Sequence, residues 1–300
     1  MNLWDNREFN VMLLKEVNKL IKSKEYIYEI KFDGIRACIF GNNKSIKIIS
    51  RNKKDITNLF PELVNIKEMF NKNTILDGEI ICLLNNKISF DAIQERMHLK
   101  NKDKIKLASN NNSAIFVAFD ILYLDKNLID LSLIERKKIL NNFKESDNFI
   151  ISKTYADSLS LFKFVKKNNM EGIVAKLKNS KYLINTRSEN WLKIKNYQTN
   201  YFYIGGYEKK KNKYISVKLG EYQNGKLIYV GSASLMNNSV LYLNILNLKI
   251  LSDSPFENYD EKIVYVKVKL KCKVKYIEKT KNNQLRQPII MGDKNEFNKI

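Results

Sequence analysis

The spacing of apolar residues changes about two-thirds of the way along the chain, and that change restricts the folds open to it. In the first two-thirds, apolar residues recur every three or four positions in three segments, which predicts helices at 10–23, 135–143 and 158–169. Short segments rich in β-branched and aromatic residues lie between them and predict strands at 26–32, 44–50, 74–84 and 114–124. This mixture indicates an α+β domain in the first part of the chain.

The last third consists mainly of expected strands, which alternate apolar and polar residues between Gly and Asn-Gly turns. Gln223-Asn224-Gly225-Lys226 lies between two such strands, a pattern typical of a β-hairpin. One helix is expected at roughly 238–249. These features predict a five-stranded β-barrel of the OB type over residues 201–300, with the domain boundary near Asn196–Asn200.

The charge balance indicates a polyanionic partner. The chain has 53 Lys and Arg against 32 Asp and Glu, a formal net charge of +21, and nucleic acid is the commonest polyanion that such a field attracts. Lys greatly outnumbers Arg, which suits contact with phosphates better than the reading of bases. A general bias of composition toward Lys, Asn and Ile accounts for part of the charge, so charge alone supports only backbone binding.

Composition argues against several other classes of protein. No run of about 18 uncharged apolar residues is present, so a membrane span is not expected, and the N-terminal segment lacks the apolar core of a secretory signal. With one histidine, His98, a Cys/His zinc site is not expected. Cys38, Cys82 and Cys272 are far apart and are expected to be buried, in a protein of the reducing cytoplasm.

Charged residues recur on expected strands that are otherwise apolar. Glu29, Lys31 and Asp33 alternate and so face one side, and Gly34 and Arg36 follow directly. Further charges occur in the segments Asp77-Gly78-Glu79, Phe119-Asp120, Glu171-Gly172-Ile173-Val174-Ala175-Lys176 and Trp191-Leu192-Lys193-Ile194-Lys195. Each segment alone is also typical of a solvated strand face, but their joint order predicts a polar cleft on an apolar sheet.

In the same order, the motifs KFDGIR, SRNKKDIT, LDGEI, FVAFDIL, EGIVAK and WLKIK resemble the motif set of ATP-dependent DNA ligases, especially the compact bacterial and phage type. The resemblance covers nearly the whole chain, because YIGGY at 203–207 and LRQP at 285–288 are similar to barrel motifs of the family. It implies a nucleotidyltransferase (adenylation) domain of ATP-grasp-like antiparallel sheets with helices at 1–197, followed by the OB-fold domain at 201–300. Capping enzymes and RNA ligases share the lysine motif.

The resemblance implies catalytic roles for three lysines. Lys31 would attack the α-phosphate of ATP and hold AMP through a phosphoramidate bond. Lys193 and Lys195 would neutralise charge on the phosphate oxygens in the transition state. We expect these two cations, together with Arg36, to lower the pKa of Lys31 so that it can attack as a neutral amine.

Other residues are implied to bind the nucleotide and Mg²⁺. Glu29 would accept a hydrogen bond from the adenine amino group and Phe119 would stack on the base, whereas Arg36 and Glu79 would bind the ribose hydroxyls. Glu79 and Glu171 would also hold Mg²⁺, a hard cation that takes carboxylate oxygens and water. Lys176 is expected to join the phosphate contacts.

Two further residues lie in motifs that depart from the family pattern. Arg51 resembles the arginine that engages the 5′-phosphate of the nick, but Lys53 replaces the usual glycine, and we expect Asn52 to supply the left-handed turn. Arg286 would orient pyrophosphate, although no second arginine precedes Asp293-Lys294.

The expected activity is the sealing of 5′-phosphate/3′-hydroxyl nicks in duplex DNA by a cytoplasmic monomer that uses ATP and Mg²⁺. AMP would pass from Lys31 to the 5′-phosphate and then leave as the 3′-hydroxyl closes the strand, with hinge motion near Asn196–Asn200. Replication, recombination and repair roles all stay open, as does an end-binding repair partner. The alternatives are an mRNA capping guanylyltransferase, an RNA ligase, or a non-catalytic basic protein that binds nucleic acid.

Overall fold

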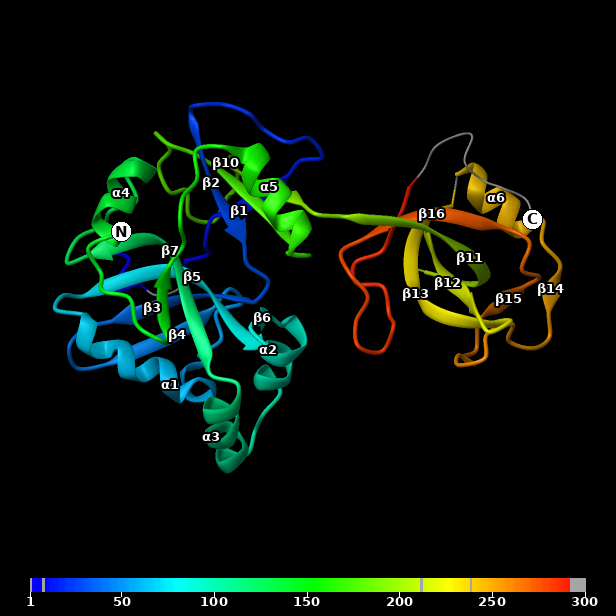
Figure 1. Ribbon diagram of the computed structural model, residues 1–300, viewed down its shortest axis with the longest axis horizontal. Coiled ribbons are helices and arrows are strands. Elements are labelled where there is room, and N and C mark those ends of the chain that lie inside the picture. Colours follow the sequence, from blue (N-terminus) through cyan, green and yellow to red (C-terminus); the bar gives the residue numbers. More distant parts are fainter. Residues whose placement is uncertain (1, 7–8, 211–212, 238, 292–300) are drawn as a thin grey trace. The chain divides into compact units, whose positions relative to one another are not determined.

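The computed structural model describes residues 2–6, 9–210, 213–237 and 239–291, and the chain divides into two units, Met1–Asn196 and Tyr197–Ile300 (Figure 1). Two sheets form the frame of the first unit. One sheet has the strand order β1 (Leu13–Glu16), β10 (Arg187–Lys195), β9 (Gly172–Leu177) and β2 (Tyr26–Lys31). The other has the order β4 (Ile46–Ser50), β3 (Ile35–Gly41), β5 (Thr74–Leu84), β7 (Ala114–Leu124) and β8 (Phe149–Ile151), and β6 (Lys87–Ile88) pairs with β5.

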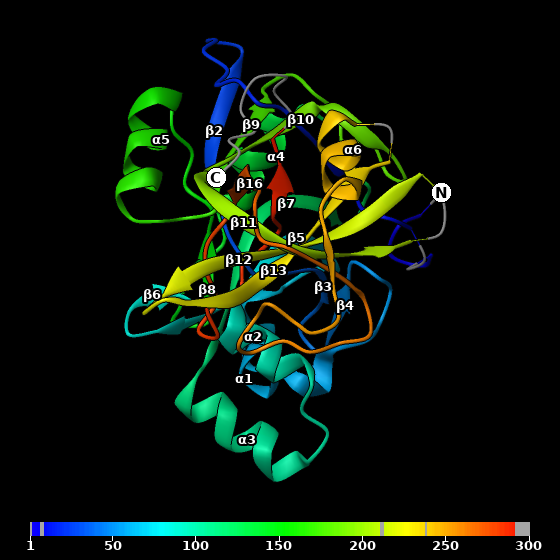
Figure 2. The ribbon, with the colours of Figure 1, turned by 90° about the vertical axis from the view of Figure 1, so that its right-hand side faces the viewer.

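Helices cover the outer faces of these sheets. The α-helices of this unit are α1 (Pro61–Val64), α2 (Phe90–Met97), α3 (Lys102–Asn111), α4 (Leu133–Leu140) and α5 (Ser158–Lys167), with short 3-10 turns η1 (Thr57–Leu59) and η2 (Asn65–Met69). Helix α5 packs Leu161 and Val165 onto β2 and β9, and Figure 2 shows it beside β2. Helices α4 and α5 confirm the helices predicted at 135–143 and 158–169.

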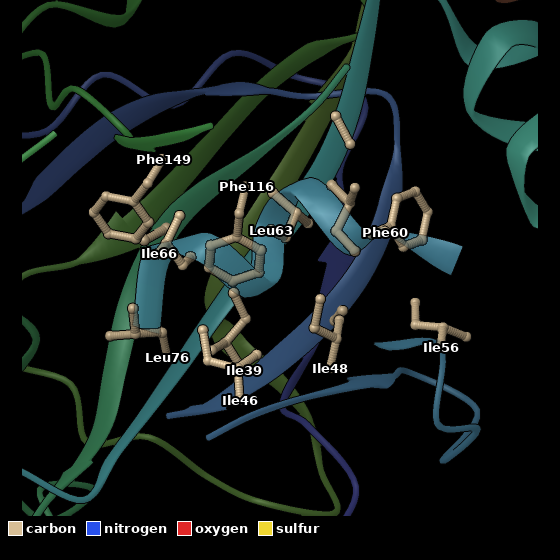
Figure 3. Packing of buried hydrophobic residues seen from close by; sticks show 14 of the residues in the cluster. Ile39, Ile46, Ile48, Ile56, Phe60, Leu63, Ile66, Leu76, Phe116 and Phe149 are labelled. Carbon is tan, nitrogen blue, oxygen red and sulfur yellow. The ribbon is translucent and has the colours of Figure 1, made fainter. Parts of the chain in front are cut away.

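Strand β3 shows why the two sheets stack. Its residues are buried on both faces, because successive side chains of a strand point to opposite sides. Ile39 packs under α1 and η2, in the cluster with Leu63 and Phe116 that Figure 3 shows. Phe40 belongs instead to a second core that also contains Trp191 of β10, so this core joins the two sheets.

The prediction of a helix at 10–23 is wrong. Residues Leu13–Glu16 form β1, which pairs in parallel with the edge strand β10, Leu13 opposite Arg187 and Glu16 opposite Lys193. The amide of Leu13 donates to the carbonyl of Thr186 at 2.8 Å. Pairing to a distant strand overrides the local apolar spacing here, as tertiary context often does.

The second unit is an antiparallel barrel sheet, and one helix, α6 (Val240–Leu246), lies within its described residues. Its strand order is β13 (Lys226–Met236), β12 (Tyr214–Gln223), β11 (Gln198–Lys209), β15 (Val264–Val266) and β14 (Ile250–Leu251), and β16 (Lys271–Tyr276) pairs with β11 and with β17 (Ile289–Ile290). Within its described residues the sheet has seven strands, not the five expected, because β14 and β17 add two-residue edges. The hairpin prediction is confirmed: Asn224 and Gly225 both have positive φ, 50° and 79°.

Other expectations also have outcomes in the structure. All three cysteines are free and buried, as expected. None of the helices in the described ranges has the length and apolar character needed to cross a membrane.

Candidate active site

A pocket between the two sheets of the first unit brings together six of the residues singled out from the sequence. It opens to solvent and has a cavity volume of about 50 Å³, and the predicted residues that line it are Glu29, Lys31, Arg36, Glu79, Phe119 and Lys176. β2 and β9 supply one wall, and β3, β5 and β7 supply the other. The sequence motifs, which are up to about 150 residues apart, therefore converge on one cavity.

Cross-strand register explains why Lys31 and Lys195 lie on the same face of the sheet. Lys31 of β2 lies opposite Gly172 of β9, and Gly172 lies opposite Lys195 of β10. Directly opposed residues share one face of a sheet, so Lys31 and Lys195 flank a glycine at roughly two strand spacings, about 10 Å. A Cβ on Gly172 would lie 2.2 Å from the carbonyl oxygen of Ile194, so this close approach requires glycine.

Lys31 is paired with a carboxylate. Its Nζ donates to Oε2 of Glu171 at 2.6 Å, and its side chain is 20 % exposed. Burial lowers the pKa of Lys31, but the charges of Glu171 and Glu79 outweigh this and leave the pKa raised. The expectation that neighbouring cations lower this pKa is therefore wrong, because the carboxylates of Glu171 and Glu79 are the nearby charges that affect it most.

Glu79 differs from Glu171 in having no partner. It makes no ion pair and no side-chain hydrogen bond with any residue in the described part of the chain. Burial raises its pKa to about 7, although the charges of Lys31 and Arg36 oppose the shift. This carboxyl is thus half-protonated near neutral pH and would gain from a further cation.

Glu29 lies at the other end of the pocket wall. Its carboxylate is within 2.6 Å of Lys137 Nζ and 3.0 Å of Lys176 Nζ, and Ser152 Oγ donates to it at 2.8 Å. Burial raises the pKa of Glu29, but the two lysines outweigh it and lower the pKa overall. Burial also lowers the pKa of Lys176, to about 8, against the opposing charge of Glu29.

Lys176 therefore lies beside Glu29, and the structure does not bring it to Lys31. In the β2–β9 register, Lys176 is opposite Ile27, whereas Lys31 is opposite Gly172. Four residues along a strand correspond to about 13 Å. The contact of Lys176 with the phosphates stays a prediction, and the distance of Lys176 from Lys31 argues against it.

Aromatic rings line the same end of the pocket. Phe119 and Trp191 meet edge to face, with ring centroids 5.9 Å apart, and Lys176 Nζ is 4.5 Å from the Phe119 centroid. The guanidinium of Arg36 lies 5.3 Å from the same ring. A flat, partly cationic surface of this kind suits an electron-rich aromatic ligand.

Buried ion pairs hold this frame in place. Arg36 donates to both oxygens of Asp77, at 3.0 and 2.7 Å, and Tyr182 Oη donates to Asp77 at 2.7 Å. The charge of Asp77 raises the pKa of Arg36 despite burial. Arg136 of α4 makes a matching bidentate pair with Asp120 of β7. Breaking either pair would leave a buried charge, at a cost of about 3–5 kcal/mol.

Lys193 and Lys195 share one partner, which the sequence did not reveal. Oε2 of Glu16 lies 3.2 Å from Lys193 Nζ and 3.4 Å from Lys195 Nζ. Burial lowers the pKa of Lys193, and the charge of Lys195 lowers it further. Neither lysine lines the pocket, but both lie on the strand next to β9, in cross-strand rows with Glu29 and Lys31.

Arg51 lies outside this pocket. It follows β4, where its amide donates to the Arg36 carbonyl at 2.9 Å, and its side chain borders a separate small pocket with Phe9 and Lys53. The turn does form, but Lys53 itself adopts the left-handed conformation, with φ 62°. The expectation that Asn52 does so is wrong, since the left-handed position is the one where the family has glycine.

Arg286 belongs to the second unit, where its Nη1 is 3.0 Å from Glu278 Oε1. Its predicted role stays untested, and Asp293-Lys294 lies outside the described residues. The residues that sequence reasoning missed are Glu16, Lys137, Asp77 and Trp191. Asp77 and Trp191 lie inside recognised motifs, whereas Glu16 and Lys137 lie in segments that read as ordinary amphipathic helices.

A strand whose lysine lies beside carboxylates in a two-sheet pocket, with an OB-type barrel after it, is the arrangement of the covalent nucleotidyltransferases. Within that class, the chain belongs to the ATP-dependent DNA ligase family, because residues 11–195 match the family model described as the ATP dependent DNA ligase domain. The resemblance read from the motifs is thereby confirmed, and so is the α+β fold with its nucleotidyltransferase and OB-type parts.

Individual relatives agree with this membership. The chain is 33% identical over 281 residues to the SPbeta prophage-derived DNA ligase-like protein LigB of Bacillus subtilis (strain 168), covering 92% of this chain and 96% of that one. It is 32% identical over 232 residues to the bifunctional non-homologous end joining protein LigD of the same strain, covering 70% of this chain but 37% of LigD. The structure of mycobacterial DNA ligase D complexed with ATP and MES shares the fold, with a TM-score of 0.59 at 24% identity and coverage of 97% and 98%. These findings support ATP-dependent DNA ligase function and do not favour the alternatives.

Proposed function

We propose that the pocket binds ATP and that Lys31 forms the covalent adenylate from which this chain seals nicks in duplex DNA. The neutral Lys31 amine attacks the α-phosphorus, the bond to the bridging oxygen breaks, and pyrophosphate leaves with the electron pair. The observation that carries the proposal is the position of Lys31, which lines the pocket and donates to Glu171 at 2.6 Å, an acceptor for its proton.

The two ends of the pocket suit the two ends of the nucleotide. Glu29 and Phe119 lie together with Lys176, which supports adenine binding there: a ring can stack, and a carboxylate can accept from an amino group. Lys31 lies at the other end, next in register to Gly172 and Lys195, which supports binding of the phosphates. Arg36 and Glu79 lie between them, beside where a ribose would fall.

The residues present also fit Mg²⁺. The carboxyl groups of Glu79 and Glu171 face Lys31. The pKa of the unpaired Glu79 is raised to about 7, and a bound divalent cation would favour the ionised form of this carboxyl. No cluster of three or more Asp, Glu, His or Cys ligands occurs among the described residues, so substrate phosphates and water would complete the coordination. When bound, the cation would withdraw charge from the phosphates and weaken the hold of Glu171 on Lys31.

The second unit offers a surface for the DNA backbone. Lys271, Lys273 and Lys275 alternate along β16 and face outward, while Cys272 and Val274 between them are buried. Tyr201 of β11 lies opposite Lys273 and beside Lys271, whose Nζ is 5.7 Å from its ring. Outward-facing lysines beside an exposed tyrosine of the neighbouring strand suit sugar–phosphate contacts without base reading, as the net charge of +21 also does. We propose a nicked duplex as substrate and a monomer as the active form.

The test follows label from nucleotide to protein to DNA. The full chain is incubated with Mg²⁺ and α-labelled ATP or, separately, α-labelled GTP, resolved under denaturing conditions, and chased with nicked duplex. Lys31→Arg keeps the charge facing Glu171 but removes a usable nucleophile, and Lys181→Ala serves as control because Lys181 pairs only with Asp130 on the surface. We expect label from ATP in wild type and Lys181→Ala, no label in Lys31→Arg, and transfer to DNA before sealing.

Any other labelling or sealing result would favour one of the alternative functions. Label from GTP alone would move the chain to the capping class, and sealing of nicked RNA but not DNA would favour an RNA ligase. Absence of label from wild type with either nucleotide would refute the proposed chemistry and leave a non-catalytic binding protein.

A further inference from the structure

Glu16 sits where no motif of the site predicts a functional residue. It is the last residue of β1, directly opposite Lys193 in the parallel β1–β10 register. A single oxygen, Oε2, lies 3.2 Å from Lys193 Nζ and 3.4 Å from Lys195 Nζ. One carboxylate therefore bridges the two cations that the proposed function assigns to the phosphates.

Lys193 and Lys195 need such a bridge because their positive charges repel each other. They are two residues apart on one strand, so both ammonium groups lie on one face. Burial and the charge of Lys195 lower the pKa of Lys193, and Lys31 adds a smaller effect of the same sign; Glu16 opposes all three. Without Glu16, the three positive charges of Lys31, Lys193 and Lys195 would favour splayed side chains and loss of a proton.

The bridge leaves the lysines able to bind a ligand. An ammonium group has three donors, and Glu16 occupies one donor of Lys193, so the others can reach phosphate oxygens. The side chain of Glu16 is 31 % exposed, which means that its loss opens no cavity in a packed core. Its contribution is therefore electrostatic rather than structural.

We propose that Glu16 is a positioning residue, which holds Lys193 and Lys195 together so that both meet the α-phosphate during lysyl-AMP formation. This inference rests on the proposed function. The charge of Lys31 also acts on Lys193, and the charges of Glu171 and Glu79 act on Lys31. Lys31 and Lys193 therefore have separate requirements in lysyl-AMP formation. Lys31 must lose a proton to attack, whereas Lys193 must keep one to bind phosphate.

The two requirements give lysyl-AMP formation a bell-shaped dependence on pH. The rising limb reports Lys31, and the falling limb reports Lys193. Replacing Glu16 by a neutral residue should move the falling limb alone to lower pH. For a pair that is partly exposed, we expect a shift of roughly half a pH unit to one unit.

The experiment measures the single-turnover rate of lysyl-AMP formation from pH 6.5 to 10.5, with the full chain first stripped of AMP by pyrophosphate. Glu16→Gln removes the charge and Glu16→Asp keeps it. Glu189→Gln is the matched control, because Glu189 lies on the same pair of strands but pairs with the surface residue Lys15. Melting curves establish that each variant is folded.

We expect Glu16→Gln to shift the falling limb and leave the rising limb in place, Glu16→Asp to restore most of the wild-type profile, and Glu189→Gln to match wild type. If Glu16→Gln and Glu189→Gln give the same profile as wild type, Glu16 has no positioning role, although the proposed function stands. If wild type forms no lysyl-AMP at all, the proposed function fails and this inference fails with it.

Discussion

Lys53 carries backbone strain that glycine would relieve. It has φ 62° in the turn after β4, is exposed, and donates its amide to the Ser50 carbonyl at 2.8 Å. A left-handed conformation costs a residue with a Cβ about 1–2 kcal/mol. Glycine avoids that cost but has more conformational freedom in the unfolded chain, which offsets about 0.5–1 kcal/mol. The net expectation for Lys53→Gly is a gain of about 1 kcal/mol in the free energy of unfolding.

The chain offers a selective probe for this change. It has two tryptophans, Trp4 and Trp191, and both lie in the unit Met1–Asn196 that contains Lys53. Tryptophan fluorescence therefore follows the unfolding of this unit alone. For a unit of this size, 1 kcal/mol corresponds to a rise in Tm of about 2–4 °C.

Asn52 provides the matched control, since it is the neighbouring residue and has a negative φ. Asn52→Gly adds chain freedom without relieving strain, so it should leave the Tm unchanged or lower it. The reasoning is refuted if Lys53→Gly does not raise the Tm, or if Asn52→Gly raises it equally, because the gain would then not depend on the left-handed position.

Three further predictions concern the site and the barrel. Burial raises the pKa of Glu79 from its ordinary value of 4.5 to about 7, so the ionised carboxyl destabilises the fold increasingly as pH rises from 4.5 to 7, and this effect is absent below pH 4.5. Glu79→Gln should be more stable than wild type at pH 8 by up to about 3 kcal/mol, equal to it near pH 4.5, and less stabilised by Mg²⁺ in thermal melts. Glu171→Gln removes the charge that most raises the pKa of Lys31, so the rising limb of the pH–rate profile should move to lower pH, a shift that Glu145→Gln should not produce. Changing Lys271, Lys273 and Lys275 together to Ala should reduce the slope of log affinity for duplex DNA against log salt by about 2–3, and an unchanged slope in a salt titration would exclude this face as a backbone contact.

Most strands could be predicted from the sequence because their residue composition favours the same strand conformation that their pairing in the sheet stabilises. Thr74–Leu84 and Ala114–Leu124 are rich in β-branched and aromatic residues, and they pair with each other over nearly their whole length. Leu13–Glu16 was misread because its strand character comes entirely from pairing with β10, which lies about 170 residues further along. Local spacing cannot reveal a partner so distant in sequence.

The same limit applies to the site. Residues that act within a motif, such as Lys31 and Glu171, were identified because the motif places them. Lys137 was not, because it lies on α4 between Arg136 and Lys138, and a lysine within such a run of charges is expected to be solvated; only the fold turns it toward Glu29. Glu16 was missed for the same reason, within a segment predicted as a helix.

Carboxylates beside the lysines of the site explain how a chain of net charge +21 keeps these lysines in order. Each lysine of the site has a carboxylate neighbour: Lys31 has Glu171, Lys193 and Lys195 have Glu16, and Lys176 has Glu29. A triphosphate brings the negative charge that these carboxylates now supply, so its binding can replace ion pairs instead of creating them. Binding then changes the partners of the lysines more than their positions, and the site is prepared for charge before the substrate arrives. The protein's wider positive field draws DNA and ATP toward the site, while these carboxylates keep repulsion among the lysines from disordering it.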